Sequence, residues 1–305
     1  MRIFVTGSTG FVGTAVVKEL LLAGHNVLGL TRSDKGASQL EALGAEPLHG
    51  TLQDLETLKQ GASQTDAVIH LGFVHDFTNF AESCATDRAA IDALGSALAK
   101  AGGDRALVVT SGTMMLAQGK LGKEDDAFEA SNPMAAARGP SEAVCLDFAK
   151  KGVRASVVRL PPTTHGPGVS GFTGMLTSIA LQKGISAYVG EGHNRLCAVH
   201  RDDAAKVYRL AVEKGAPGSV FHAVAEEGVQ LRDIASGIAK ALGIQTVSIP
   251  AEEVEGHFGP FQFAALADNT ASSVLTRQKL GWAPTDSTVV DDIPVIVDFI
   301  KAQSG

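Results

Sequence analysis

Three glycines at positions 7, 10 and 13 constrain the fold more than any other feature of this chain. They form the pattern G-x-x-G-x-x-G, which follows the apolar run IFVT and precedes the helical sequence FVGTAVVKELLLAG. Glycines at this spacing allow a tight strand-to-helix turn and a close ligand approach, and a helix N-terminus attracts a pyrophosphate. The sequence therefore predicts a dinucleotide-binding turn. Its expected contacts are Gly7, Ser8, Thr9, Gly10, Phe11, Val12 and Gly13.

Short apolar runs alternate with helical patterns through the first 160 residues. The expected strands span 2–6, 26–31, 45–49, 66–70, 105–111 and 153–160. Nearly all their residues are apolar, as in parallel strands that helices cover on both faces. This alternation predicts an α/β protein with a Rossmann-type doubly wound parallel sheet.

The character of the sequence changes after Pro161, where the Pro/Gly-rich segment PPTTHGPGVSG is expected to form a loop. Shorter elements follow: helices near 171–182, 202–214 and 230–242, and strands at 186–190 and 219–223. We predict a dinucleotide-binding part over 1–165. Residues 166–305 are expected to be mainly a smaller substrate-binding lobe, with some segments returning to the first part. The two parts are expected to pack around one cleft.

Composition and charge argue against several classes of partner. Apolar residues make up 45% of the chain and charged residues 19%, as in soluble globular proteins. The net charge of −7 comes without a basic block, so no nucleic-acid partner is expected. No run of 18 apolar residues exists, so no membrane association is expected.

Cysteine usage and the chain start favour a cytoplasmic protein. Cys84, Cys145 and Cys197 are widely spaced in apolar company, which indicates reduced core thiols. Residues 1–6 already resemble a strand, which leaves no room for a leader. No metal site is predicted, because the acidic pair at 125–126 has no His or Cys nearby at ligand spacing.

The residues after the second expected strand indicate which dinucleotide is bound. NAD-binding proteins usually carry an acid there, whereas this chain reads LTRSDK. Arg32 and Ser33, with Lys35 nearby, suit a 2′-phosphate and favour NADP. NAD is the alternative, in which Asp34 takes the role of the acid.

Six segments, in order along the chain, carry a family resemblance. They are VTGSTGFVG at 5–13, GTLQD at 50–54, DAVIHLGF at 66–73, RLPPTTHGPG at 159–168, AVHRDDAAKVYRLAVE at 198–213 and KLGWAP at 279–284. Together they resemble extended short-chain dehydrogenases/reductases of the NAD-dependent epimerase/dehydratase group, and specifically an atypical subgroup without the usual catalytic tyrosine. The resemblance covers nearly the whole chain. It implies a nicotinamide dinucleotide cofactor and a homodimer through the fourth and fifth helices.

The resemblance also assigns the remaining cofactor contacts. The adenine is expected near Thr51 and Leu52, with Thr51 in place of the first Asp of the family's GDLxD segment. The residues expected to line the cofactor further along are Leu71, Gly72, Phe73 and Pro161.

The catalytic segments depart from the family pattern. At the end of the fifth strand, Gly112 falls on the commonest hydroxyl position, which leaves Ser111 and Thr113 as candidates. In the Tyr-x-x-x-Lys segment, the preferred register places Met134 at the tyrosine and Arg138 at the lysine. The alternative register places Arg138 and Glu142 there. The two tyrosines of the chain, Tyr188 and Tyr208, lie in the second half.

A site of this composition needs another proton source. Methionine donates no proton, and Arg138 is always charged, so it is expected to hold the ribose and lend positive field. Ser111 or Thr113 is expected to polarise the substrate oxygen. His165, His75 or water is expected to deliver the proton, although His165 equally suits a space-filling role. His70 is interpreted as a core histidine, His193 as part of a surface turn and His200 as a helix cap.

The substrate side is expected to include His75, Met134 and Met114. The aromatic segment GHFGPFQFAAL at 256–266 is interpreted either as a lid over an apolar or aromatic substrate or as the core of the lobe. The leading hypothesis is an NADP(H)-dependent oxidoreductase. It would act on a small, mostly apolar carbonyl or alcohol substrate by hydride transfer without a catalytic tyrosine. The alternatives are an NADP-binding regulatory protein with lapsed catalysis, and a lyase or isomerase on the same scaffold.

Overall fold

The computed structural model describes residues 1–76, 78–129, 131–168 and 171–304. Its centre is a parallel sheet of seven strands in the order β11-β7-β5-β4-β1-β2-β3. The strands are β1 (Arg2–Thr6), β2 (Asn26–Thr31), β3 (Glu46–His49), β4 (Ala67–His70), β5 (Ala106–Gly112), β7 (Arg154–Leu160) and β11 (Ser219–His222). This order confirms the predicted Rossmann-type doubly wound sheet. The strand order reverses between β1 and β4, the position where ligands bind in such folds.

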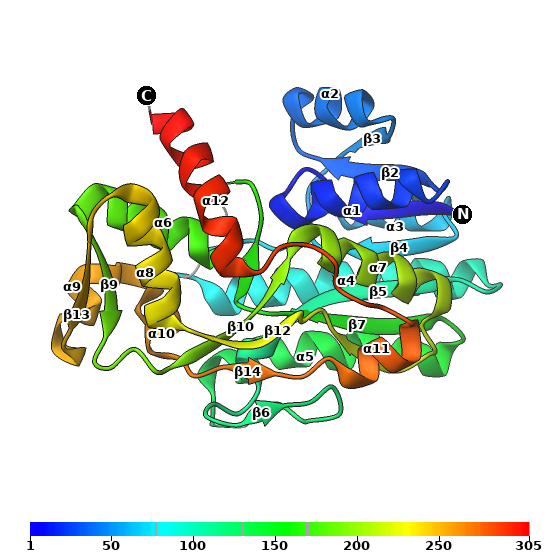
Figure 1. Cartoon of the computed structure of the whole chain (residues 1–305). Coiled ribbons are helices and arrows are strands. Elements are labelled where there is room, and N and C mark those ends of the chain that lie inside the picture. Colours follow the sequence, from blue (N-terminus) through cyan, green and yellow to red (C-terminus); the bar gives the residue numbers. More distant parts are fainter. Residues whose placement is uncertain (77, 130, 169–170, 305) are drawn as a thin grey trace.

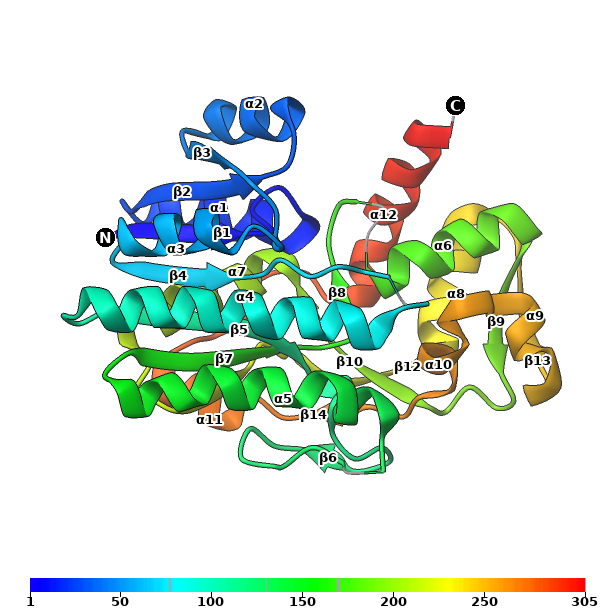
Figure 2. The ribbon, with the colours of Figure 1, turned by 180° about the vertical axis from the view of Figure 1, so that it is seen from behind.

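Helices cover both faces of this sheet, which explains its apolar strands (Figures 1 and 2). One face carries α1 (Phe11–Leu22) and α7 (Arg201–Lys214), which pack together over Ile3 and Val5. The other face carries α3 (Leu55–Ser63), α4 (Phe80–Ala101) and α5 (Pro133–Asp147), packed around Phe4. Beside β3, α2 (Asp34–Leu43) completes the first half.

A second apolar core lies beyond the carboxyl ends of the strands. It is built from Phe172, Leu176, Ile234, Ile238 and Ile293, all buried. The elements around it are α6 (Phe172–Lys183), β9 (Ile185–Val189), α8 (Leu231–Leu242), β13 (Gln245–Ile249), α9 (Val254–Phe258), α10 (Gln262–Leu266) and α12 (Val289–Ser304). Strands β9 and β13 pair in parallel. α7 and β11 lie between these segments in sequence but belong to the main sheet and its helices.

Short elements join the two cores. They are β6 (Leu121–Gly122), β8 (Thr163–His165), β10 (Arg195–His200), β12 (Glu226–Gln230), β14 (Thr270–Ala271) and α11 (Val274–Leu280), with single-turn helices η1 (Thr113–Met115), η2 (Phe148–Lys151), η3 (Ala251–Glu253) and η4 (Gly259–Phe261). Strand β10 lies between β8 and β12 in a three-stranded sheet. No helix within the described ranges is long and apolar enough to cross a membrane.

The expectation that the whole segment from Pro161 onward is a loop was wrong for β8. Residues 163–165 pair with 198–200 of β10, which was also expected to be loop, so His165 lies opposite His200. All three residues of β8 are buried, and buried backbone groups need partners that a neighbouring strand supplies. The prolines and glycines on either side hid this short strand. The three cysteines are buried free thiols, as predicted.

Candidate active site

The glycine turn between β1 and α1 is packed too tightly for side chains. Gly7 has φ +67°, and a Cβ on it would lie 2.7 Å from the backbone N of Gly72 in the segment after β4. A Cβ on Gly13 would lie 1.9 Å from the carbonyl oxygen of Gly7. The first turn of α1 therefore rests directly on the glycine turn, and the backbone can approach a ligand closely.

The N-terminus of α1 is left open to a negative ligand. Its cap residue is Gly10, the first turn holds no acidic residue, and no described side chain caps it. The unsatisfied N–H groups and the helix dipole therefore favour an anion there. Ser8 points elsewhere, because its buried hydroxyl donates to Leu30 O at 2.8 Å, whereas Thr9 is half-buried. Phe11 and Val12 are half-buried in the first turn.

The end of β2 presents two exposed cations. Arg32 and Lys35 flank Ser33, whose hydroxyl accepts the N–H of Gly36 at 3.2 Å and so caps α2. Asp34 is fully exposed, with His49 4.0 Å away. The predicted 2′-phosphate contacts therefore gather at one helix start.

The expected adenine and cofactor-lining residues lie along the ends of β3 and β4. Thr51 is exposed and Leu52 is half-buried. Leu52 lies close to Gly72, because a Cβ added to Gly72 would be 2.9 Å from the Leu52 side chain. Leu71 and Phe73 are half-buried, whereas Pro161 is buried behind β7 and its carbonyl accepts the hydroxyl of Thr164.

A buried polar chain runs from β1 to α5. Thr6 accepts the N–H of Gly72 at 3.1 Å and donates to His70 Nδ1 at 2.7 Å. The His70 proton is then on Nε2, which donates to Asp87 at 3.3 Å. Arg138 donates to the second oxygen of Asp87. Burial alone would raise the pKa of Asp87, but the hydrogen bond from His70 and the charge of Arg138 lower it.

Arg138 is held at the end of β5 by three contacts. Besides Asp87, its guanidinium donates to Thr110 O at 2.7 Å and lies 4.7 Å from the centre of the Phe73 ring. Glu142, one turn further along α5, forms a two-bond pair with the buried Arg159 at 3.0 and 2.9 Å. Because both carboxylate oxygens of Glu142 are bonded to Arg159, Glu142 is not available at the position of the family's lysine. This favours the register that places Met134 at the tyrosine and Arg138 at the lysine.

The two candidate hydroxyls differ in their partners. Ser111 Oγ is buried and meets no hydrogen-bond partner among the described residues. Thr113 is fully buried and donates to Asn269 Oδ1 at 2.8 Å, while Asn269 Nδ2 donates back to Thr113 O at 3.0 Å. The geometry therefore favours Ser111 as the hydroxyl that could bind a ligand, whereas Thr113 is already bonded to Asn269 and has a positioning role.

The histidines separate into different environments. His165 is completely buried, and its Nδ1 donates to Asp292 at 3.0 Å, so it has no access to solvent. His75 is exposed and its ring meets Phe73 edge-on at 5.4 Å. Desolvation by its neighbours and the charge of Arg138 lower the pKa of His75. His70 is a hydrogen-bonded core residue, and His200 caps α7 by accepting the N–H of Asp202, as predicted for both.

Neither tyrosine can replace the missing phenol where it stands. Tyr208 on α7 is fully buried behind β5, where its hydroxyl meets that of Thr110 at 2.8 Å. Burial raises the pKa of Tyr208 far above its usual range. Tyr188 lies on β9 against the second core.

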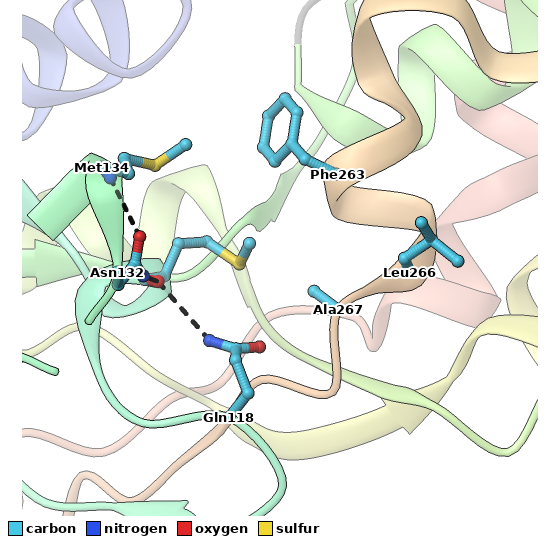
Figure 3. Close-up of a pocket in the computed structure, with 7 residues that line it drawn as sticks. Gln118, Asn132, Met134, Phe263, Leu266 and Ala267 are labelled. Atoms are coloured by element: carbon cyan, nitrogen blue, oxygen red, sulfur yellow. Dashed lines mark hydrogen bonds between the residues drawn. The ribbon is translucent and has the colours of Figure 1, made fainter. Parts of the chain in front are cut away.

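A pocket of about 230 Å³ opens beside the start of α5 (Figure 3). Its lining consists of Met114, Gln118, Asn132, Met134, Phe263, Leu266 and Ala267. The structure thus brings together two of the predicted substrate residues, Met114 and Met134, with a third segment from α10. Within the aromatic segment, Phe258 is buried in the second core, as the core interpretation predicts, and Phe263 lines the pocket.

Several site residues were missed in the sequence. Asp87 lies on the buried stripe of α4 formed by residues 84, 87, 91, 94 and 98. A lone acid on such an apolar stripe is a signal that could have identified it. Asn269 and Arg201 carry no such local signal. Arg201 lies 5.0 Å from the Phe11 ring and donates to Pro167 O at 2.6 Å, contacts that exist only in the folded chain.

Arg195 at the start of β10 is paired with an acidic side chain. Its guanidinium makes two bonds to Asp268, at 3.0 and 2.9 Å. Within the described ranges, no three His, Cys, Asp or Glu side chains come together as metal ligands would.

Comparisons with known proteins agree with this architecture. The sequence model of the NAD dependent epimerase/dehydratase family matches residues 3–224. An uncharacterized protein of Schizosaccharomyces pombe is 49% identical over 294 residues, covering 96% of this chain and 98% of its own length. A 4-hydroxy-2-methyl-3-oxo-4-farnesyl-3,4-dihydroquinoline-1-oxide ketoreductase of Stigmatella aurantiaca is 28% identical, covering 90% and 84%.

Among solved structures, a dTDP-glucose 4,6-dehydratase of Streptomyces venezuelae superposes with a TM-score of 0.81 at 19% identity, covering 99% of this chain and 97% of its own. At that identity the likeness concerns the fold. The family match spans well over half of the sequence. It includes the glycine turn, β5, and the segment with Met134 and Arg138. The chain therefore belongs to the NAD dependent epimerase/dehydratase family.

Proposed function

We propose that the protein is an NADP(H)-dependent oxidoreductase that acts on a small, mostly apolar carbonyl or alcohol substrate without a catalytic tyrosine. The observation that carries this proposal is the glycine turn, in which Gly13 rests on Gly7 and leaves the N-terminus of α1 open. Family membership and the ketoreductase among the relatives support an enzyme of the NAD(P)-dependent class.

The residues present fit a dinucleotide along the ends of the strands. The pyrophosphate would meet the N–H groups at the start of α1, and Arg32, Ser33 and Lys35 would hold a 2′-phosphate. The bound dinucleotide would supply or accept the hydride. Arg138 uses two of its five N–H donors on Asp87 and Thr110, and the rest are able to meet ribose hydroxyls.

Ser111 is the proposed group that polarises the substrate oxygen, because its hydroxyl is buried and has no partner within the described part of the chain. The proton would come from water or from the exposed His75. His165 is a weaker candidate, since it is enclosed and bonded to Asp292. The apolar pocket at Met114 and Met134 favours a substrate without phosphate groups. Arg195, the partial counterpart of an arginine that sugar-nucleotide enzymes of the resembled group often carry, supports the same conclusion because its guanidinium is already bonded to Asp268.

A specific observation also favours a second function, an NADP-binding regulator. Met134 stands where the family has its proton donor, and Arg138 is fixed by Asp87. Such a protein would bind NADPH without oxidising it, and the bound state would act as a signal to a partner.

The test is to titrate NADPH into the purified protein by calorimetry and then to follow NADPH absorbance with a panel of apolar aldehydes, ketones and quinones. We expect binding and consumption with at least one carbonyl, and loss of that turnover in Ser111→Ala. Tight binding without consumption across the panel would support the regulator instead. Absence of binding would refute both functions.

A further inference from the structure

The two polar side chains that line the pocket donate amide N–H groups to the backbone around it. Gln118 and Asn132 both donate their amide N–H groups to Met114 O, at 3.4 and 3.0 Å. Asn132 Oδ1 accepts the N–H groups of Met134 and Ala135. These amides therefore fix the η1 turn and the start of α5, and no charged side chain is part of the lining. What remains for a ligand is mainly carbon and sulfur.

Two thioethers and an aromatic ring line this space. Met134 lies on one side of it, and Phe263 and Leu266 of α10 lie on the other (Figure 3). Met114 is also part of the lining. Phe263 and Leu266 are 38% and 50% exposed, although apolar residues of this size are usually buried. Exposed apolar side chains that gather at a pocket mark a binding site. Thioethers and phenyl rings both make favourable contacts with flat aromatic ligands.

The chemistry of the catalytic candidates restricts the carbonyl further. Reduction of an isolated ketone produces an alkoxide, which needs a proton as the hydride arrives. Met134 supplies none, and Ser111 donates a hydrogen bond but is too weak an acid. Desolvation lowers the pKa of His75, which favours the neutral form of its ring. A carbonyl in a conjugated ring produces instead a phenolate-like anion, whose conjugate acid has a pKa near that of tyrosine, about 10. Such an anion needs only a hydrogen bond and can take its proton from water.

We propose that the substrate is a quinone, bound with its ring between Met114, Met134 and Phe263 and with one oxygen toward Ser111. This inference rests on the proposed function. The bound reduced dinucleotide would supply a hydride from its C–H bond. With its electron pair, the hydride would form an O–H bond at one quinone oxygen and leave the other oxygen, toward Ser111, as the phenolate. The quinone becomes the hydroquinone monoanion and the dinucleotide becomes NADP⁺. One proton from water completes the hydroquinone, so one quinone, one NADPH and one proton are consumed.

Methionine methyl groups provide a readout that needs no turnover. The chain has five methionines, and the ¹³C-methyl signals of two are assigned with Met114→Leu and Met134→Leu. With NADP⁺ bound, naphthoquinone should move both signals by its ring current and leave that of Met175, on α6, in place. Decalone, the saturated two-ring ketone, should not move them in this way. Unchanged Met114 and Met134 signals with naphthoquinone would overturn the proposal.

Turnover provides the second test. We expect kcat/KM for naphthoquinone to exceed that for decalone at least about tenfold, and Phe263→Ala to raise KM for naphthoquinone about fivefold. Phe299→Ala is the matched control, because Phe299 is 37% exposed on α12 and does not line the pocket. An enzyme that reduces decalone as efficiently as naphthoquinone would refute the quinone assignment but keep the oxidoreductase. A protein that consumes NADPH with neither and binds no dinucleotide would refute the proposed function itself.

Discussion

Arg138 forms an ion pair with Asp87, whose carboxylate is completely shielded from solvent. His70 donates to the same carboxylate from β4 at 3.3 Å. The pair fixes a permanent positive charge at the end of β5, beside the pocket that Met134 lines. Because a guanidinium does not release its proton at any physiological pH, this charge can orient a ligand but cannot act as an acid.

Replacing Arg138 with methionine should destabilise the fold. Asp87 would keep the hydrogen bond from His70 but lose its cation, and a buried charge without its ion-pair partner costs about 3 kcal/mol. Urea unfolding at neutral pH measures this loss. The control is the same change in an Asp87→Asn background, where we expect the loss to be much smaller because no buried charge remains. Equal losses in both backgrounds would contradict the ion pair.

Ser111→Ala should affect mainly turnover, and Thr113→Val should affect mainly the free energy of unfolding. Ser111→Ala should lower kcat about a hundredfold with little change in stability, because its hydroxyl has no protein partner in the described structure. Thr113→Val should lower the free energy of unfolding by about 1–3 kcal/mol, because Asn269 Oδ1 loses its hydroxyl donor and keeps only the weak thiol donor of Cys197 within the described structure. Steady-state kinetics and urea unfolding of both variants check this. If Thr113→Val alone abolished turnover while the fold kept its stability, the two roles would be reversed.

The architecture was predictable because its signals are local. The glycine turn, the apolar strands and the helix capped by His200 each depend on residues close in sequence. The strand β8 was not predictable, because its partner β10 lies more than thirty residues away and Pro and Gly surround it. The long-range pair of Thr113 and Asn269 was missed for the same reason.

In the candidate site, too, residues with a local signal were predicted and long-range contacts were not. Met134 was expected at the substrate from its place in the Tyr-x-x-x-Lys segment, and Met114 from its place next to Thr113. Both line the pocket. The enclosure of His165 depends on Asp292, 127 residues further along the chain. The sequence around His165 resembles an exposed loop and contains no sign of that contact.

Arg32→Ser should change coenzyme preference. Arg32 is exposed beside the cap of α2, and a charge-assisted contact to a 2′-phosphate contributes about tenfold or more in affinity. We expect the Kd for NADPH to rise by that factor while the Kd for NADH changes little. Lys59→Ser, an exposed cation on α3, is the control. An equal weakening for both coenzymes would argue against the 2′-phosphate contact.

Acid should weaken the fold through His222. Burial, together with the charge of Arg159, lowers the pKa of His222 to about 4. A histidine with a lowered folded pKa binds more protons when unfolded, so its contribution is complete above pH ~6.5 and falls as the pH drops toward ~4. Between pH ~7 and ~4.5 the loss amounts to about 2 kcal/mol.

Urea unfolding of wild type and His222→Gln across this range isolates the effect. The variant should lose less stability on acidification by about that amount. Parallel pH profiles for the two proteins would show that His222 does not titrate as its burial implies.

The most direct measurement of the central claim is calorimetric titration of NADPH into wild type, Gly13→Ala and Gly256→Ala. A Cβ on Gly13 meets Gly7 O at 1.9 Å, whereas a Cβ on Gly256 meets nothing within 4 Å. We predict binding by wild type and Gly256→Ala, and no measurable binding by a folded Gly13→Ala protein. Equal affinity in all three, or no affinity of the wild type for any nicotinamide dinucleotide, would contradict the account.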